Sequence, residues 1–407
     1  MESSDKILKR QKFRIHFKNE DMDFIFNWML GYGSLTGLSH GELFYLANQI
    51  KDGSPDSWQT AFHRHGQFHL QQAEEHLKGN KTKNAGNNFV SAAQSFRASL
   101  QFISPQDSQF KQRIDQLEHS FQQYIKYHEI PVESVEIPFE DGSLPGYFLK
   151  IDERERPTLI VIGGGDTFRE DLYFFAGIGG FARGYNVVMI DLPGQGKTPF
   201  SKLYFRPDAE TPIAKVIDWL LQQPTSDKER IAVYGLSSGG YFSARAAAFD
   251  KRIKAWVAST PIYSLPLLFE REMPKALRKS PGWLANFLVK IAGKMNQAAA
   301  VNIEKYFWQA GVSSYEEGMI KATNFGTVDY KLISCPCLFL VGENEADELK
   351  RQADEIYNCL KDKTEATLKI FTAQEGADTH CQVNNLRLSQ QTIFDWLDDI
   401  FGRNAAR

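Results

Sequence analysis

The stretch IAVYGLSSGGYFSARAAAFD, residues 231–250, contains the clearest fold signal in this chain. It starts as an apolar run typical of a buried β-strand and ends as an alanine-rich run typical of an α-helix. The six residues between these runs, GLSSGG, hold three glycines and two serines. Because glycine has no Cβ, this composition predicts a sharp turn that takes the chain directly from the strand into the helix.

Strand-like runs alternate with helical stretches on both sides of this turn, from about residue 131 onward. The runs are TLIVIGGG (158–165), NVVMIDLPG (186–194), IKAWVAST (253–260), CLFLVGENE (337–345) and TLKIFTAQEG (367–376). Near-continuous apolar strands that are each followed by a helix predict an α/β fold, with a mostly parallel central sheet covered by helices on both faces.

The N-terminal part of the chain has a different pattern. Residues 21–127 carry apolar side chains at three- and four-residue spacing, which predicts an all-helical block of about five helices. We therefore expect a helical lid domain at 1–130 and a catalytic domain at 131–407. A helical insertion at about 261–332 interrupts the strand series, and we expect it to lie above the C-terminal ends of the strands as a second lid element.

The composition argues against several classes of function. The chain has 407 residues, with 47 Lys and Arg against 50 Asp and Glu and a formal net charge of -3. Without a basic excess, nucleic acid is not an expected partner, and small-molecule chemistry is favoured. Residues 1–21 are charged throughout, and no apolar run approaches the roughly 18 residues of a membrane span. We expect a soluble cytoplasmic protein with no membrane partner.

The glycine-rich turn also predicts a reactive serine. GLSSG, at 235–239, fits the pattern G-x-S-x-G, in which a serine on a strained strand-to-helix turn is exposed as a nucleophile. Ser237 occupies the central position. Ser238 would begin the helix, where its backbone N–H can face a developing oxyanion. The alternative interpretation is a glycine and serine turn without reactivity.

A serine nucleophile needs a base, and the distribution of histidines indicates which one. Of the nine histidines, only His380 follows Ser237 in the chain. In enzymes with this serine turn the chain order is serine, acid, histidine, and the histidine follows the last strand. His380 stands between the last strand-like run and the last helical run, so we predict it as the base.

The acid that orients such a histidine is expected in the segment CLFLVGENEADELKRQ (337–352), after the preceding strand. Glu345 lies three residues past Gly342, the usual depth of the acid in this loop. Asp347 has the commoner side chain at a less usual position. Both residues are candidates.

The loop after an earlier strand can supply the second oxyanion donor. In VIGGGDTFRED (161–171) three consecutive glycines let the backbone approach a reacting carbonyl, and the N–H of Gly165 or of Gly164 would complete the oxyanion hole. The stretch DLPGQGKTP (191–199) is not a phosphate loop, because Asp191 stands where that motif requires glycine.

We predict no metal and no cofactor. His65, His69 and His76 share one face of a predicted helix, but no acidic ligand stands near them at motif spacing. We interpret them as partly buried histidines of the helical block. The four cysteines show no zinc or disulfide spacing.

Several of these segments carry a resemblance to a known family. IGGGDTFREDLYFF, RGYNVVMIDLPGQGKTP, VYGLSSGGYFSARAAA and GADTHCQVNN resemble α/β-hydrolases with an N-terminal helical lid. That group includes the carbon–carbon hydrolase of bacterial nicotine breakdown, 2,6-dihydroxypseudooxynicotine hydrolase, and the polyketide-shortening hydrolases of fungal melanin and bacterial anthraquinone pathways. SWQTAFHRHGQFHLQQAEEHLKGN and SAAQSFRAS extend the resemblance to the helical block, and thus over nearly the whole chain.

The resemblance implies roles for individual residues. Ser237 matches the nucleophile of the family and His380 its base. The family's acid falls on Glu345, where this sequence has glutamate in place of the usual aspartate. The resemblance also implies a homodimer without a cofactor, and a substrate buried between the lid and the sheet.

The resemblance further implies a retro-Claisen reaction, in which the serine attacks a ketone and a carbon–carbon bond breaks. The expected partner is then a small molecule, an aromatic polyketide or related β-diketone that is either free or carrier-bound. A carboxylesterase or thioesterase for a bulky acyl substrate is an alternative, because the same turn serves esters and thioesters. A non-catalytic binding protein with this fold is a third interpretation.

Overall fold

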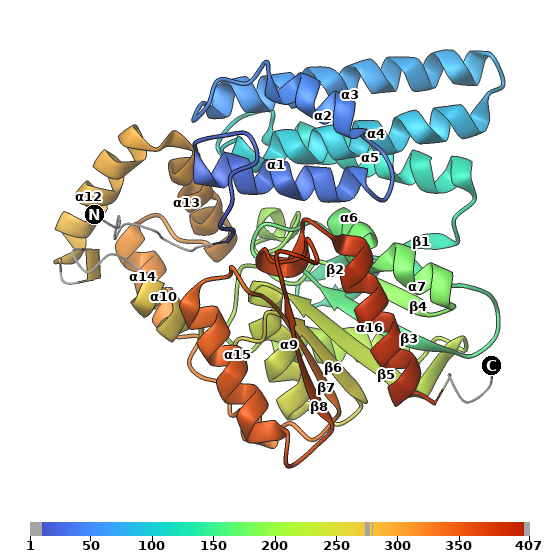
Figure 1. Cartoon of the computed structure of the whole chain (residues 1–407), viewed down its shortest axis with the longest axis vertical. Helices are drawn as coiled ribbons and strands as arrows, with labels where there is room; N and C mark the ends of the chain where they lie inside the picture. The colour runs from blue at the N-terminus through green and yellow to red at the C-terminus, as the bar shows by residue number, and fades with distance from the viewer. Residues whose placement is uncertain (1–9, 273–276, 279, 403–407) are drawn as a thin grey trace. The chain divides into compact units, whose positions relative to one another are not determined.

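The computed structural model describes residues 10–272, 277–278 and 280–402 (Figure 1). Contacts within the chain define two compact units. The sheet unit comprises Met1–Lys12, Val132–Ala285 and Gln309–Arg407, and the helical unit comprises Phe13–Pro131 and Asn286–Trp308.

Two parts of this division differ from the sequence prediction. Residues 10–12, which we expected in the helical lid domain at 1–130, belong to the sheet unit. We expected the whole insertion at 261–332 to belong to the catalytic domain, but Asn286–Trp308 is part of the helical unit. Trp308 packs edge-on against Phe110, with ring centroids 5.3 Å apart. This contact joins segments that are distant in the chain, so the local sequence pattern could not indicate it. The main boundary, between Pro131 and Val132, lies next to the predicted one.

The sheet unit is built on an eight-stranded sheet with the order β1-β2-β4-β3-β5-β6-β7-β8. The β1–β2 and β2–β4 pairs are antiparallel, and the remaining pairs are parallel, as predicted. The strands are β1 (Val132–Phe139), β2 (Gly142–Leu149), β3 (Arg156–Ile162), β4 (Asn186–Ile190), β5 (Ser226–Leu236), β6 (Ala255–Ser259), β7 (Cys337–Gly342) and β8 (Ala366–Phe371).

The register of the parallel strands brings several loops to one edge of the sheet. Ile162 at the end of β3 pairs with Gly235 in β5, and Leu236 pairs with Ser259 at the end of β6. The glycine loop after β3 and the serine turn after β5 therefore begin side by side. This is the edge at which open α/β sheets bind ligands.

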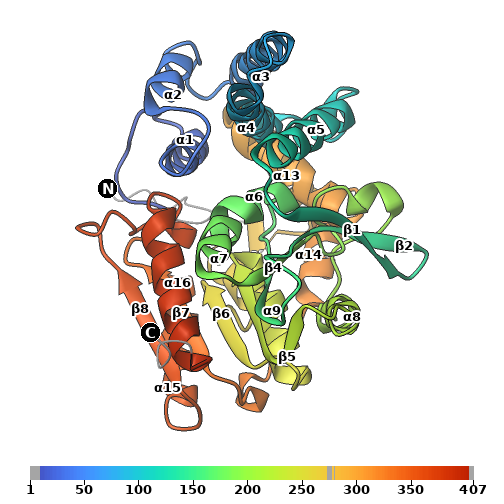
Figure 2. The same ribbon diagram turned by 90° about the vertical axis from the view of Figure 1, so that its right-hand side faces the viewer.

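Helices flank the sheet (Figure 2). α8, α9 and α15 contribute to one hydrophobic core, in which the side chain of Trp256 from β6 is fully buried. α7 and α16 pack against each other, and Tyr185 contacts Phe394 of α16 at a centroid distance of 5.2 Å. The helices of this unit include α6 (Arg169–Leu172), α7 (Ile178–Arg183), α8 (Glu210–Leu220), α9 (Ser238–Phe249), α10 (Leu265–Glu272), α14 (Tyr315–Thr323), α15 (Asp347–Leu360) and α16 (Leu386–Ile400).

The helical unit contains the five helices that the N-terminal periodicity predicts. They are α1 (Glu20–Gly33), α2 (His40–Ala47), α3 (Pro55–Lys78), α4 (Thr82–Ser99) and α5 (Phe110–His128), and most of α12 (Gly282–Met295) and α13 (Gln297–Ala310) joins them. Trp58 is fully buried, meets Phe102 edge-on at 5.2 Å and donates from Nε1 to the carbonyl of Ala98. Among the described residues, no helix is long and apolar enough to cross a membrane.

Candidate active site

The turn between β5 and α9 holds its central serine in an unusual backbone conformation. Ser237 has φ 52° and ψ -122°, in the left-handed region that costs a non-glycine residue about 1–3 kcal/mol. A Cβ at Gly235 would lie 2.1 Å from the carbonyl oxygen of Gly239, and a Cβ at Gly239 would lie 2.6 Å from that of Gly163. Both outer glycines of the motif are therefore required by the close approach of the backbone.

His380 lies next to this serine. It opens the short helix η5 (His380–Gln382), in the loop between β8 and α16, and it is 6% exposed. Its Nε2 is 2.9 Å from Oγ of Ser237, within hydrogen-bond distance. The fold thus brings together a hydroxyl and an imidazole that are 143 positions apart in the sequence.

A buried carboxylate lies on the other side of the imidazole. Oε2 of Glu345 is 3.3 Å from Nδ1 of His380, and the glutamate is fully buried. Its Oε1 accepts a 3.1 Å hydrogen bond from the backbone N–H of Gly342, and its Oε2 accepts one from the hydroxyl of Thr260. These two donors hold the carboxylate in place beside His380.

The other predicted acid, Asp347, lies elsewhere. It is the first residue of α15, its side chain is 97% exposed, and it forms an ion pair with Lys350 at 2.9 Å. The start of this helix turns residue 347 toward solvent, whereas the loop before it turns Glu345 inward. The structure therefore brings Glu345, and not Asp347, to His380.

The surroundings of His380 change its proton affinity. Burial opposes a charge on the imidazole, but the neighbouring Cys381 and Glu345 favour the charged form, and the pKa of His380 is raised to about 10.

The predicted oxyanion loop lies against Ser237. A Cβ at Gly164 would be 2.8 Å from Cβ of Ser237 and 3.3 Å from its Oγ, so only glycine allows this approach. The N–H of Gly165 belongs to the same planar trans peptide as the carbonyl of Gly164 and points in the opposite direction. Ser238 is the first residue of α9, at the positive end of the helix dipole.

Two glutamines that the sequence analysis did not identify support this loop. Nε2 of Gln195 donates to the carbonyl oxygens of Gly163 and Gly164, and Nε2 of Gln309 donates to that of Gly165 at 2.5 Å. Gln195 lies within the glycine-rich stretch that fails as a phosphate loop. The sequence around Gln195 gave no sign of this role except the glycine-rich stretch itself. The contacts join residues more than thirty positions apart, so a local pattern could not predict them.

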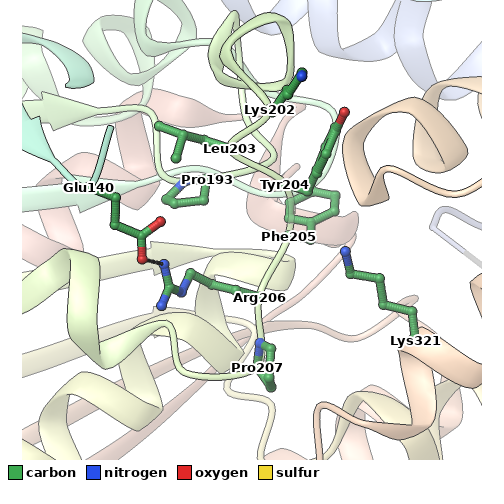
Figure 3. A pocket seen from close by; sticks show the side chains of 9 residues that line it. All are labelled: Glu140, Pro193, Lys202, Leu203, Tyr204, Phe205, Arg206, Pro207 and Lys321. Carbon is green, nitrogen blue, oxygen red and sulfur yellow. Dashed lines mark hydrogen bonds and ion pairs between the residues drawn. The ribbon is translucent and has the colours of Figure 1, made fainter. Parts of the chain in front are cut away.

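A separate pocket of about 300 Å³ lies in the sheet unit (Figure 3). It is lined by Glu140, Pro193, Lys202, Leu203, Tyr204, Phe205, Arg206, Pro207 and Lys321, and Arg206 points to Glu140 and bonds to it. None of Ser237, His380 and Glu345 is among these lining residues. The pocket is therefore distinct from the serine and histidine arrangement.

A mostly parallel sheet with a serine on the strand-to-helix turn and a histidine after the last strand is the α/β-hydrolase architecture. The family model described as alpha/beta hydrolase fold matches residues 157–294. A curated relative, Hydrolase LUC6 of Fusarium sp, is 30% identical over 413 residues, covering 95% of this chain and 98% of the relative. The chain belongs to the α/β-hydrolase family and is a hydrolase.

Other relatives and structures match over nearly the full chain. The 20-hydroxy-prefusarin hydrolase FUS2 of Gibberella moniliformis is 28% identical over 415 residues, covering 95% of this chain and 97% of that protein. The crystal structure of 2,6-dihydroxy-pseudo-oxynicotine hydrolase superposes with a TM-score of 0.68 at 18% identity, covering 92% of this chain and 95% of that one. The structure of AbyA5 gives a TM-score of 0.63 at 14% identity, covering 89% and 90%. The two structures show that the fold, including helices outside the sheet, is shared.

Proposed function

We propose that Ser237, His380 and Glu345 form the catalytic triad of a serine hydrolase. The observation that carries the proposal is the 2.9 Å contact between Nε2 of His380 and Oγ of Ser237, with the carboxylate of Glu345 at 3.3 Å from Nδ1. In such a triad the histidine takes the serine proton, and the acid holds the imidazole in the required tautomer and stabilises the imidazolium.

The proposed reaction is the retro-Claisen cleavage of an aromatic polyketide or related β-diketone. His380 removes the proton from Ser237, and Oγ attacks a ketone carbonyl to give a tetrahedral oxyanion. Backbone N–H groups of Ser238 and of Gly165 or Gly164 would stabilise this charge. The carbon–carbon bond then breaks, its electron pair leaves as an enolate or phenolate, and the imidazolium returns the proton to the leaving carbon.

The second half of the reaction releases the acid. His380 takes a proton from water, the resulting hydroxide attacks the acyl-serine, and the proton then passes to Oγ as the carboxylic acid leaves. Support for a ketone substrate comes from the family resemblance, and likeness to named hydrolases across the whole chain supports the hydrolase role. One of these carries the name of a 20-hydroxy-prefusarin hydrolase, and another that of a 2,6-dihydroxy-pseudo-oxynicotine hydrolase.

Two experiments test this proposal. A fluorophosphonate probe should label the wild type and Ser238→Ala, which keeps its backbone N–H, but not Ser237→Ala. If the folded wild type takes no label, the protein is a binding protein with a hydrolase fold. Mass spectrometry of the products from a β-polyketone and from simple esters then separates the chemistries. Turnover of esters alone would make the protein an esterase and reject carbon–carbon cleavage.

A further inference from the structure

A cluster of three metal-ligand side chains lies within the helical unit. His65 and His69 are one turn apart on one face of α3, and Glu42 comes from α2. One ligand atom from each residue, a ring nitrogen of each histidine and a carboxylate oxygen, lies within 4.8 Å of the other two. The sequence analysis found the histidines but no acid at motif spacing. The missing carboxylate comes from a different helix.

The carboxylate of Glu42 is held in a defined orientation. Its Oε2 accepts hydrogen bonds from the backbone N–H of Ser39 at 2.8 Å and from the Ser39 hydroxyl at 2.7 Å, in the capping box of α2. The other oxygen, Oε1, faces the histidines, 2.9 Å from Nε2 of His69 and 3.9 Å from Nε2 of His65.

The two ring nitrogens of His69 have different partners. Nδ2 of Asn88 donates to the carbonyl of Asn84 at 3.0 Å, which directs Oδ1 of Asn88 to Nδ1 of His69 at 2.9 Å. Nδ1 therefore carries a proton, and Nε2 carries a lone pair in the neutral ring. Nε2 faces the carboxylate of Glu42, so its lone pair is placed to act as a metal ligand.

His65 has the same arrangement. The hydroxyl of Ser95 gives its proton to the carbonyl of Ser91 at 2.8 Å, so its oxygen accepts from Nδ1 of His65 at 3.3 Å. Nδ1 of His65 therefore carries the proton of the neutral ring, which leaves the lone pair on Nε2. That lone pair faces the same carboxylate oxygen.

We propose that Glu42, His65 and His69 bind a divalent transition-metal ion, with Zn²⁺ as the first candidate. Zinc bonds of about 2.0–2.2 Å in a tetrahedral site place neighbouring ligand atoms about 3.4 Å apart. The distances of 2.9 Å and 3.9 Å from Oε1 lie on either side of that value. Both distances are within about 0.5 Å of the tetrahedral value.

The groups around the cluster also suit a metal site. Histidine ligands donate their other ring N–H to a polar group that fixes the tautomer, and Asn88 and Ser95 occupy those positions. The side chain of Glu42 is 32% exposed, so water can complete the coordination. Imidazole ligands favour zinc, copper and nickel over magnesium. The bound ion would join α2 to α3 and stabilise the helical unit.

The test is metal binding by tag-free, full-length protein that has been stripped with EDTA and desalted. Isothermal titration with ZnCl₂ should give one strong site per chain, and MgCl₂ should give none. Cobalt(II) should give a tetrahedral absorption spectrum without a thiolate charge-transfer band, which excludes the cysteines as ligands. Zinc should also raise the melting temperature.

The variants assign the site. His65→Gln and Glu42→Gln should abolish the strong zinc site, and Asn88→Ala should weaken it by roughly 10- to 100-fold, the effect of losing a group that orients a ligand. His63→Gln is the matched control, because His63 lies on the same helix and contacts Gln116 instead. Circular dichroism without metal checks folding.

Three outcomes of these experiments decide the proposal. If Glu42→Gln unfolds α2, the variants His65→Gln and Asn88→Ala decide. Absence of zinc binding by the wild type overturns the proposal. The proposal is also overturned if folded His65→Gln binds zinc with the same affinity as His63→Gln.

Discussion

The side-chain amide of Gln195 donates a 2.6 Å hydrogen bond to the carbonyl of Gly163, and a 3.0 Å bond to the next carbonyl, that of Gly164. Gln195 is fully buried, and the glycines on either side of it, Gly194 and Gly196, have left-handed φ angles of 91° and 51°. The glycines thus allow a tight turn that sends the glutamine inward. The stretch that resembles a phosphate loop in sequence has the structural task of holding the loop beside Ser237.

Replacing this glutamine should reduce both stability and activity. Gln195→Leu removes the donor to the carbonyl of Gly163 and the acceptor of the Leu192 N–H, at a cost of about 1–3 kcal/mol for each buried group left unsatisfied. The carbonyl of Gly164 keeps the hydroxyl of Thr167 as a donor. If the loop supplies an oxyanion donor, kcat should fall by up to about 10²–10³-fold, the effect of losing one such donor. Chemical denaturation and turnover of an activated ester measure the two effects. The exposed Gln222→Leu should change neither, and an unchanged kcat in Gln195→Leu would remove the loop from the mechanism.

The two candidate acids can be separated by neutralising each in turn. Glu345→Gln should lower kcat by about 10⁴-fold, as neutralising the acid does in another serine triad. Asp347→Asn should have nearly the wild-type rate, because its side chain is 97% exposed and pairs with Lys350. The same activated ester serves for both variants. A large loss in Asp347→Asn together with a small one in Glu345→Gln would reverse the assignment.

The pH dependence should report the raised pKa of His380. A general base must be neutral, so the rate falls as the pH falls below the pKa of this histidine. The pKa of His380 is raised from its ordinary value of 6.5, so the fall in rate, the acid limb of the pH profile, should be centred above pH 6.5. Glu345→Gln removes a negative neighbour and should move the limb to lower pH. The second-order rate of fluorophosphonate labelling, measured across pH, follows this limb without a natural substrate. A limb that does not move in the variant would exclude Glu345 as a charge partner.

The backbone of the serine turn should not tolerate a Cβ. In Gly239→Ala the new atom would lie 2.6 Å from two backbone oxygens, those of Ile162 and Gly163. Overpacking of this kind costs about 1–3 kcal/mol, and the shift it forces should misplace Ser237 and abolish labelling. Gly41→Ala is the control, because its Cβ would meet nothing closer than 3.9 Å. The melting temperature and the labelling of this control should equal those of the wild type.

The fold class could be predicted because its signals are local. Whether a segment forms a strand or a helix depends on the spacing of apolar residues along a short stretch. The alternating pattern after residue 131 therefore predicted a mostly parallel sheet, and the structure shows one. The turn at Ser237 is local in the same way. His380 could be named because no other histidine follows the serine, and the structure places it 2.9 Å from Oγ.

Tertiary structure decided what depends on contacts between distant segments. It placed Glu345, and not Asp347, beside His380, because the loop before α15 directs one side chain inward and the start of the helix directs the other to solvent. It also showed the buried hydrogen bonds of Gln195, and it brought Glu42 to two histidines on another helix. By itself, the sequence determined the strands, the helices and the serine turn, which arise from neighbouring residues. Only the folded chain determined which polar side chains meet, because their partners are brought together by packing rather than by spacing along the chain.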